Sequence, residues 1–286
     1  MRRAIKLLLP VVVVFAIAPA ARALPIVGAS ANTIPARRFM IDTWGTWQDF
    51  TVSWQGDGNG GSGWIGFTEE RKWTTGSLVP RVYYGVTDRL TVRAALPLED
   101  RYREYDFDGP IESATGLGDI VIDPKFQIFR AERGYPRVAA LAGVRFPTGD
   151  TGGDGTPPLS DGSTDYMLGG VISHKEGSIT AHACVTYWMN GEREDGTDVT
   201  DLIVGLASIE TPLDGSWNLL WEFKGVYSET PSEFHRTYVC PGIMWSGDHM
   251  NIGLSALVSM SAKGKVGIST LDYDWAPYLR IYYRFF

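Results

Sequence analysis

Cysteine is scarce in this chain, with two among 286 residues. Two thiols exclude both a disulfide-stapled scaffold and a metal site of four cysteines. Basic residues are also in deficit, because 26 Lys and Arg face 33 Asp and Glu and leave a net charge of −7. A general nucleic-acid binder needs clustered Lys and Arg to neutralise phosphates. We therefore expect no nucleic-acid partner.

Long hydrophobic runs are missing beyond the first 23 residues, so we expect no transmembrane helix in the rest of the chain. Residues 1–23 have the parts of a secretory signal peptide: a basic start, an apolar core over residues 7–18 and an Ala-x-Ala cleavage site at residues 21–23. The core is shorter than the roughly 20 residues that a membrane anchor needs. We expect cleavage near Ala23, export, and a single domain over residues 24–286.

Apolar and aromatic residues are abundant, at 44% and 12%, and there are 33 glycines. This composition excludes intrinsic disorder and favours an all-β chain. Apolar residues recur at alternate positions, as in Leu90, Val92 and Ala94 opposite Thr91 and Arg93. Such alternation fits a soluble sandwich, whose apolar face is the core, and an outer-membrane barrel, whose apolar face meets lipid.

The spacing of these runs separates the two folds. Five short turns alternate with six longer loops rich in Gly and Asp, which is typical of an outer-membrane barrel with tight periplasmic turns. We therefore predict an all-β, twelve-stranded antiparallel transmembrane β-barrel, with outer-membrane lipid and lipopolysaccharide around it. The expected strands are 39–54, 76–86, 89–104, 117–130, 136–148, 164–173, 178–190, 199–211, 217–228, 235–245, 249–260 and 275–286. The first of these is the least regular.

Several short motifs occur in an order that resembles a known family. They are YGVTDRL at 84–90, GLGDI at 116–120, PKF at 124–126, GVRFPTGD at 143–150, GSTDY at 162–166, and the closing run at 279–286. Over residues 77–286 the chain is similar to outer-membrane barrels described as "putative MetA-pathway of phenol degradation". The resemblance implies a barrel that takes up hydrophobic or aromatic compounds.

The last strand is expected to face lipid through Leu279, Ile281, Tyr283 and Phe285. Arg284 holds the penultimate alternate position, where barrels of this type have an apolar residue. We expect the barrel assembly machinery to be a partner of the chain.

Catalytic and metal motifs are weak. Gly58-x-Gly60-x-x-Gly63 has no helix after it, so it is interpreted as a loop and not as a dinucleotide site. The sequence has no G-x-S-x-G and no H-E-x-x-H. His182 and Cys184 share one strand face, but no second such pair accompanies them. We therefore expect no catalytic site, no metal and no cofactor.

Charged residues on the mixed face of the strands are the candidate lumen residues. In a lipid-embedded barrel such charges need water or paired partners around them. They either line a pore and tune its selectivity or form a salt-bridge network that plugs a narrow barrel. The candidates are Arg81, Arg93, Glu99, Asp119, Asp123, Lys125, Arg145, Asp165, Glu222, Lys224, Arg280 and Arg284.

These observations predict an outer-membrane channel or transporter for small compounds, hydrophobic or aromatic ones according to the resemblance. A structural or adhesive barrel without transport is the alternative. A membrane-embedded hydrolase and a soluble periplasmic β-protein are further alternatives, and we do not expect an enzyme.

Overall fold

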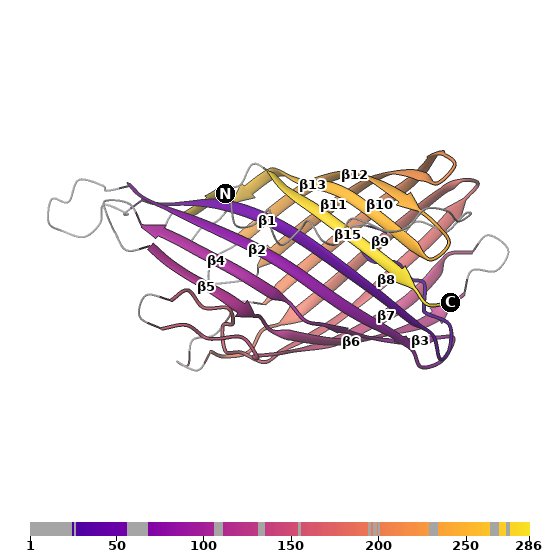
Figure 1. Ribbon diagram of the computed structural model, residues 1–286, viewed down its shortest axis with the longest axis horizontal. Coiled ribbons are helices and arrows are strands. Elements are labelled where there is room, and N and C mark those ends of the chain that lie inside the picture. Colours follow the sequence, from indigo (N-terminus) through magenta and orange to yellow (C-terminus); the bar gives the residue numbers. More distant parts are fainter. Residues whose placement is uncertain are drawn as a thin grey trace, which may run out of the picture.

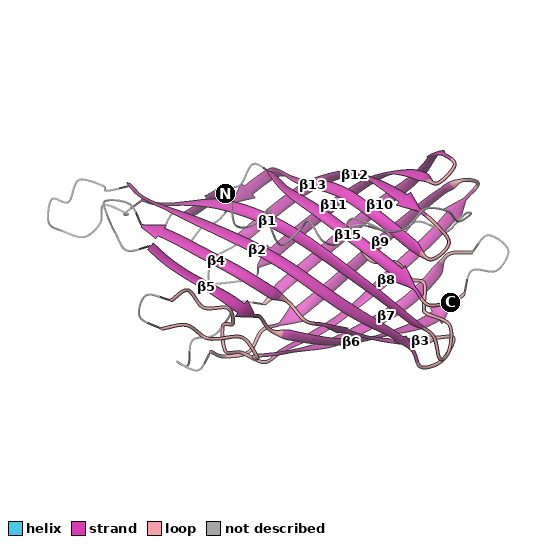
Figure 2. Cartoon of the chain, viewed as in Figure 1, coloured by secondary structure: helices cyan, strands magenta, loops and turns pink. Residues whose placement is uncertain are grey.

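The computed structural model describes residues 25, 27–55, 68–105, 111–130, 135–153, 156–193, 196, 199, 201–228, 234–263, 269–272 and 275–286. The expected signal peptide lies outside these residues. Figure 2 shows that the described part is built of strands and connecting loops. Within it, no helix has the length and apolar content needed to cross a membrane.

In the described residues, fifteen strand segments form one antiparallel sheet. They are β1 (Phe39–Gln55), β2 (Thr68–Gly85), β3 (Leu90–Ala95), β4 (Leu98–Tyr105), β5 (Ile111–Leu117), β6 (Ile120–Phe129), β7 (Arg137–Phe146), β8 (Asp165–Glu176), β9 (Ile179–Met189), β10 (Leu202–Asp214), β11 (Trp217–Ser228), β12 (Phe234–Ser246), β13 (Met250–Lys263), β14 (Ser269–Asp272) and β15 (Trp275–Arg284).

The sheet closes on itself because β1 pairs with β2 on one side and with β14 and β15 on the other. Figure 1 shows the resulting barrel of tilted strands. Three of the twelve strands are each divided into two segments. β3 and β4 follow one another along β2, and on their other side they pair with β6 and β5, respectively. β14 and β15 both pair with β1. The twelve-stranded antiparallel barrel is confirmed.

Three strand segments differ from the expected ones. β2 begins at Thr68 and not near residue 76, and β5 (Ile111–Leu117) and β14 (Ser269–Asp272) lie where loops were expected. These extensions lie at the long-loop end of the barrel, where Arg103 and Glu112 form a cross-strand ion pair. Their side chains lack the apolar alternation of a lipid-facing strand, so sequence periodicity does not reveal them.

The apolar face of the sheet points outward. Along β8 the outward Leu168 and Ile172 are 56% and 43% exposed, whereas the inward Met167 and Val171 are 5% and 2% exposed. In β15 the inward Arg280 and Tyr282 are buried between outward residues, which confirms the predicted register of the last strand. An apolar exterior on a closed sheet is the arrangement that a bilayer requires.

The short turns gather at one end of the barrel. Gly177 and Gly215 have φ values of 56° and 52°, and each lies in a tight hairpin turn that needs this left-handed conformation. The C-terminus lies at the same end, because Arg284 N–H donates to the carbonyl of His249 in the β12–β13 turn. β1 also begins at this end, because Phe285 N–H donates to the carbonyl of Phe39.

Candidate functional site

An N-terminal segment, residues 25 and 27–35, lies inside the barrel and not outside it. The Glu222 carboxylate on β11 accepts the N–H groups of Val27 and Gly28 at 2.9 and 2.8 Å. The carbonyl of Pro25 accepts from the Arg280 guanidinium on β15 at 2.9 Å. The segment therefore begins against the wall formed by β11 and β15.

The same segment also contacts the other wall. The N–H of Ala31 donates to Ser173 Oγ on β8 at 2.8 Å, and its carbonyl accepts from the Gln127 amide on β6 at 3.0 Å. Lys125 Nζ donates to the carbonyl of Ser30 at 3.0 Å. In the closed ring of twelve strands, β8 lies six strands from β15 and β6 lies five strands from β11, so the segment crosses the lumen.

A clasp at the β2–β3 turn fixes the segment before it enters β1. Ile34 N–H donates to Thr91 Oγ1 at 2.8 Å, and Arg37 N–H donates to the carbonyl of Gly85. A Cβ at Gly85 would lie 2.0 Å from the Pro35 carbonyl oxygen, so glycine is required there. The segment therefore occupies the half of the lumen nearest the short turns.

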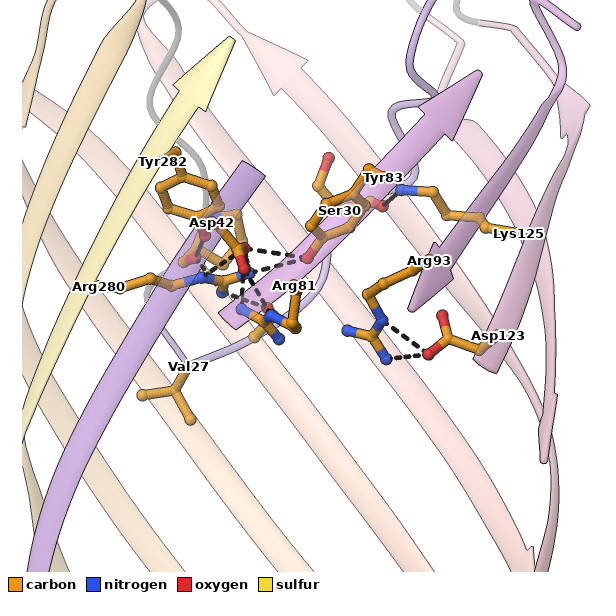
Figure 3. A network of polar contacts seen from close by, with 12 residues as sticks. Val27, Ser30, Asp42, Arg81, Tyr83, Arg93, Asp123, Lys125, Arg280 and Tyr282 are labelled. Atoms are coloured by element: carbon orange, nitrogen blue, oxygen red, sulfur yellow. Dashed lines mark hydrogen bonds and ion pairs between the residues drawn. The ribbon is translucent and has the colours of Figure 1, made fainter. Parts of the chain in front are cut away.

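Asp42 lies at the centre of a charge cluster on three adjacent strands (Figure 3). Its carboxylate accepts from Arg81 on β2 at 2.9 Å, from Arg280 on β15 at 2.7 Å, and from the Tyr83 hydroxyl at 3.0 Å. Asp42 is 1% exposed, and both arginines are also buried. The cluster joins the first strand to the last, and one carboxylate serves two guanidinium groups.

Two further pairs of predicted residues stand directly opposite each other on neighbouring strands. Arg93 on β3 donates to Asp123 on β6 at 2.7 Å (Figure 3), and Arg145 on β7 donates to Asp165 on β8. Opposite charges at facing positions of an antiparallel pair stabilise the sheet. These four residues form pairs and not isolated charges.

Asp161 lies in the connection between β7 and β8, outside the strands. Burial raises the pKa of its carboxyl, but two hydrogen bonds from Ser163, at 2.7 and 3.0 Å, and the charge of Arg145 outweigh this effect. The result is a pKa below the ordinary value. The carboxylate therefore helps to fold this connection against the barrel rim.

A buried polar chain anchors the N-terminal segment on β8, β9 and β10. Ser173 Oγ, which accepts Ala31 N–H, lies 2.7 Å from His182 Nδ1, and His182 Nε2 lies 3.3 Å from the Glu210 carboxylate. All three side chains are at most 5% exposed. Cys184 follows two residues later on the same face. Among the described residues, no three side chains are placed to hold a metal.

A cavity of about 810 Å³ surrounds the N-terminal segment. Seven of the predicted residues line it: Arg81, Arg93, Asp123, Lys125, Lys224, Arg280 and Arg284. Arg130, Arg137 and Asp88 add further charges, and Trp44, Tyr83, Trp188, Tyr278 and Tyr282 supply aromatic surface.

The other five predicted residues do not themselves line the cavity. Glu222 holds the N-terminal segment, as described above. Glu99 pairs with Arg101, and Asp119 accepts from Gly149 N–H at 3.3 Å. Together with Arg145 and Asp165, these two residues lie near the β7–β8 connection, beyond the cavity.

Sequence reasoning missed Asp42, Ser173 and Glu210 as lumen residues, and it missed the N-terminal segment. Asp42 lies in the strand whose alternation is weakest. Residues 25–35 include no charged residue, and their sequence has no periodicity that predicts a contact. The one available signal for Asp42 was its position opposite Arg81 on the neighbouring strand, and this position is known only once the strand register is known.

A closed twelve-stranded barrel with an apolar exterior and a charged lumen has the fold of an outer-membrane β-barrel. Residues 55–285 match the family described as "Putative MetA-pathway of phenol degradation", and this chain belongs to that family. No match was found among curated proteins.

Several solved barrels resemble this structure. The COG4313 outer membrane channel from Pseudomonas putida F1 is 13% identical, with a TM-score of 0.69 over 91% of this chain and 100% of that one. The translocator domain of autotransporter NalP from Neisseria meningitidis is 14% identical, with a TM-score of 0.49 over 86% and 88%. The P. putida toluene transporter TodX is 7% identical, with a TM-score of 0.45 over 88% and 90%. The first similarity supports the barrel fold.

Proposed function

We propose that this protein is an outer-membrane channel for small hydrophobic or aromatic compounds, exported with residues 1–23 as a cleaved signal peptide. The lumen cavity carries the proposal. Its volume of about 810 Å³ falls in the range of roughly 300–1,000 Å³ that pockets for small molecules occupy. The barrel wall places that cavity inside a membrane-spanning shell.

Aromatic side chains give the cavity a surface that suits such compounds. Trp44 and Tyr278 stack with ring centroids 5.0 Å apart, and both line the cavity. Arg280 lies 4.2 Å above the ring of Tyr282. Flat rings and polarised groups together favour a planar solute over a purely aliphatic one.

The N-terminal segment is the proposed closure of the channel. Its contacts with the barrel wall are single hydrogen bonds between its backbone and side chains of several strands. Each such bond contributes only about 0.5–1.5 kcal/mol, or roughly 1.5–3 kcal/mol to a charged group, so the segment can be displaced without unfolding the sheet. Passage of a solute would follow its displacement.

A hydrolase is the alternative that a specific feature suggests, because Ser173, His182 and Glu210 follow the order of nucleophile, base and acid. Catalysis of acyl transfer also needs backbone N–H groups aimed at an oxyanion. The N–H that reaches Ser173 is that of Ala31, and it donates to the hydroxyl itself. We therefore interpret these three side chains as an anchor for the N-terminal segment.

Reconstitution tests the channel. Purified protein in planar lipid bilayers should give discrete current steps, and proteoliposomes should admit small aromatic solutes. Absence of both conductance and solute flux would contradict the proposal and favour a structural or adhesive barrel. Ester hydrolysis that disappears in Ser173→Ala would instead support the hydrolase.

A further inference from the structure

The charge of the cavity is opposite in sign to that of the chain. Eight Arg and Lys side chains line the cavity, against two Asp side chains. Asp42 and Glu222 lie directly behind this surface, and even with them the cations outnumber the anions by eight to four. The whole chain carries −7. A cleft lined by one sign of charge, within walls of low dielectric, concentrates ions of the other sign.

Lys125 and Lys224 are among the lining cations that no carboxylate neutralises. Lys125 Nζ donates to the Ser30 carbonyl at 3.0 Å, and Lys224 Nζ lies 5.9 Å from the ring of Tyr238. In the part of the chain that the structure describes, neither ammonium forms an ion pair. An ammonium that lines a cavity inside low-dielectric walls without an anionic partner is costly, and a bound anion would lower that cost.

The Asp42 cluster adds to the positive charge on the same cavity. One carboxylate faces the guanidinium groups of Arg81 and Arg280, so the three groups together carry a net positive charge. Figure 3 shows this cluster on one side of the N-terminal segment, with Lys125 on the other side. An anion inside the cavity would therefore have positive groups on both sides.

Aromatic and apolar surfaces lie beside these cations. Trp44 and Tyr278 are stacked and pack in one cluster with Leu257, and Leu206 also lines the cavity. A simple inorganic anion would leave this surface without a partner. A flat ring that bears an anionic group satisfies both the cations and the rings.

We infer that the lumen binds and passes small aromatic anions, such as carboxylates or phenolates, and that Lys125 and Lys224 provide its anion selectivity. This inference rests on the proposed channel and specifies its substrate class. The N-terminal segment would then compete with the anion for Lys125, because the Ser30 carbonyl occupies that ammonium in the closed lumen.

Reversal potentials in planar bilayers under a KCl gradient test the selectivity. The wild-type channel should prefer Cl⁻ over K⁺ several-fold, and Lys125→Gln together with Lys224→Gln should abolish most of that preference. The matched control is Lys175→Gln, an exposed lysine beside the β8–β9 turn that does not line the cavity, and it should leave the reversal potential unchanged. Lys125→Arg with Lys224→Arg should restore the preference, since the charge returns.

Permanently charged probes test the aromatic part. Benzenesulfonate should block the chloride current at a several-fold lower concentration than methanesulfonate does, and benzyltrimethylammonium should not block. Block should weaken in the double glutamine variant and persist in Lys175→Gln.

The outcomes separate the two proposals. Channels that conduct but prefer K⁺, or whose reversal potential is the same in the glutamine double variant and the control, would overturn the anion inference and leave the channel intact. Equal block by the two sulfonates would overturn the aromatic part. Protein that folds and gives no current and no flux would overturn the proposed function, and the anion inference with it.

Discussion

Asp42 illustrates how one side chain balances charges that come from opposite ends of the chain. Its partner Arg280 is 238 residues away in sequence, and its partner Arg81 lies on the neighbouring strand. All three are buried, so removing the carboxylate would leave two guanidinium groups facing each other without compensation. Buried ion groups lose most when one partner alone is removed.

We therefore expect Asp42→Asn to lower the free energy of unfolding by about 3–5 kcal/mol. Guanidinium-induced unfolding in lipid vesicles measures the change. The control is Asp214→Asn, at the exposed end of β10, which should change stability by no more than about 0.5 kcal/mol. Equal effects of the two substitutions would show that the contact between the first and last strands does not depend on this carboxylate.

Glu222 holds the N-terminal segment through its carboxylate, as Asp42 holds the two arginines. Its two oxygens accept the N–H groups of Val27 and Gly28, and a charged acceptor holds such groups more strongly than a neutral one. Glu222→Gln should therefore raise the ratio of open to closed channel about tenfold, which corresponds to roughly 1.4 kcal/mol. Single-channel recording measures the ratio.

Glu176→Gln is the matched control for that experiment, because Glu176 is exposed beside the β8–β9 turn. It should leave the open fraction as in the wild type. An unchanged open fraction in Glu222→Gln as well would contradict the proposed closure by the segment.

At the scale of the element, each strand has two faces with different surroundings. On β9 the outward Val185 is 56% exposed, and the inward Cys184 and Thr186 are 3% and 8% exposed. The alternation follows from the pleat of the strand, which turns successive side chains to opposite sides. Only the outward side faces the lipid.

Val185→Arg should destabilise the folded barrel by ~2–4 kcal/mol if Val185 lies near the bilayer midplane, because the charge would enter hydrocarbon. Leu213→Arg is the control: Leu213 is 55% exposed, but it lies beside the turn that follows β10. Near the interface the same substitution should cost only about 0–1 kcal/mol. The fraction that stays folded on an unheated gel, compared across lipid compositions, checks both. Equal tolerance would contradict the assigned lipid face.

The elements also show where sequence periodicity stops being informative. The residues from Leu90 to Ala95 alternate cleanly, and β3 has the expected place. β5 has Ser113 and Thr115 at its exposed positions between Ile111 and Leu117, and the first part of β2 has the sequence TEERKW, so the period-2 apolar signal is weak although the hydrogen-bonded ladder continues. Ladder bonds need backbone groups, not apolar side chains.

At the scale of the whole molecule, closure of the sheet makes a membrane-spanning chain without an apolar helix feasible. Every strand finds a partner on both sides through the barrel wall in the membrane-spanning part, so backbone polar groups are satisfied within the sheet. One short segment of chain crosses the lumen, and the lumen is wide enough to leave a cavity around that segment.

We expect the full-length protein to be found in the outer-membrane fraction of the cells that make it, extractable with detergent and not with carbonate. Its N-terminal residue after export should be Leu24. A chain lacking residues 1–23 should remain in the cytoplasm. Recovery of the exported protein without detergent would contradict the membrane location, and an unprocessed N-terminus would contradict the signal peptide.

The sequence by itself determined the number of strands and the side that most residues of the apolar belt face, because these depend on alternation and turn spacing, which are local. It also placed Arg81, Arg93, Lys125 and Arg280 on the inner face. Only the tertiary structure decided which charges meet. Asp42 contacts Arg280 because the barrel closes, and residues 25 and 27–35 lie in the lumen because distant strands supply their hydrogen-bond partners. Such contacts depend on register and closure, which no local pattern encodes.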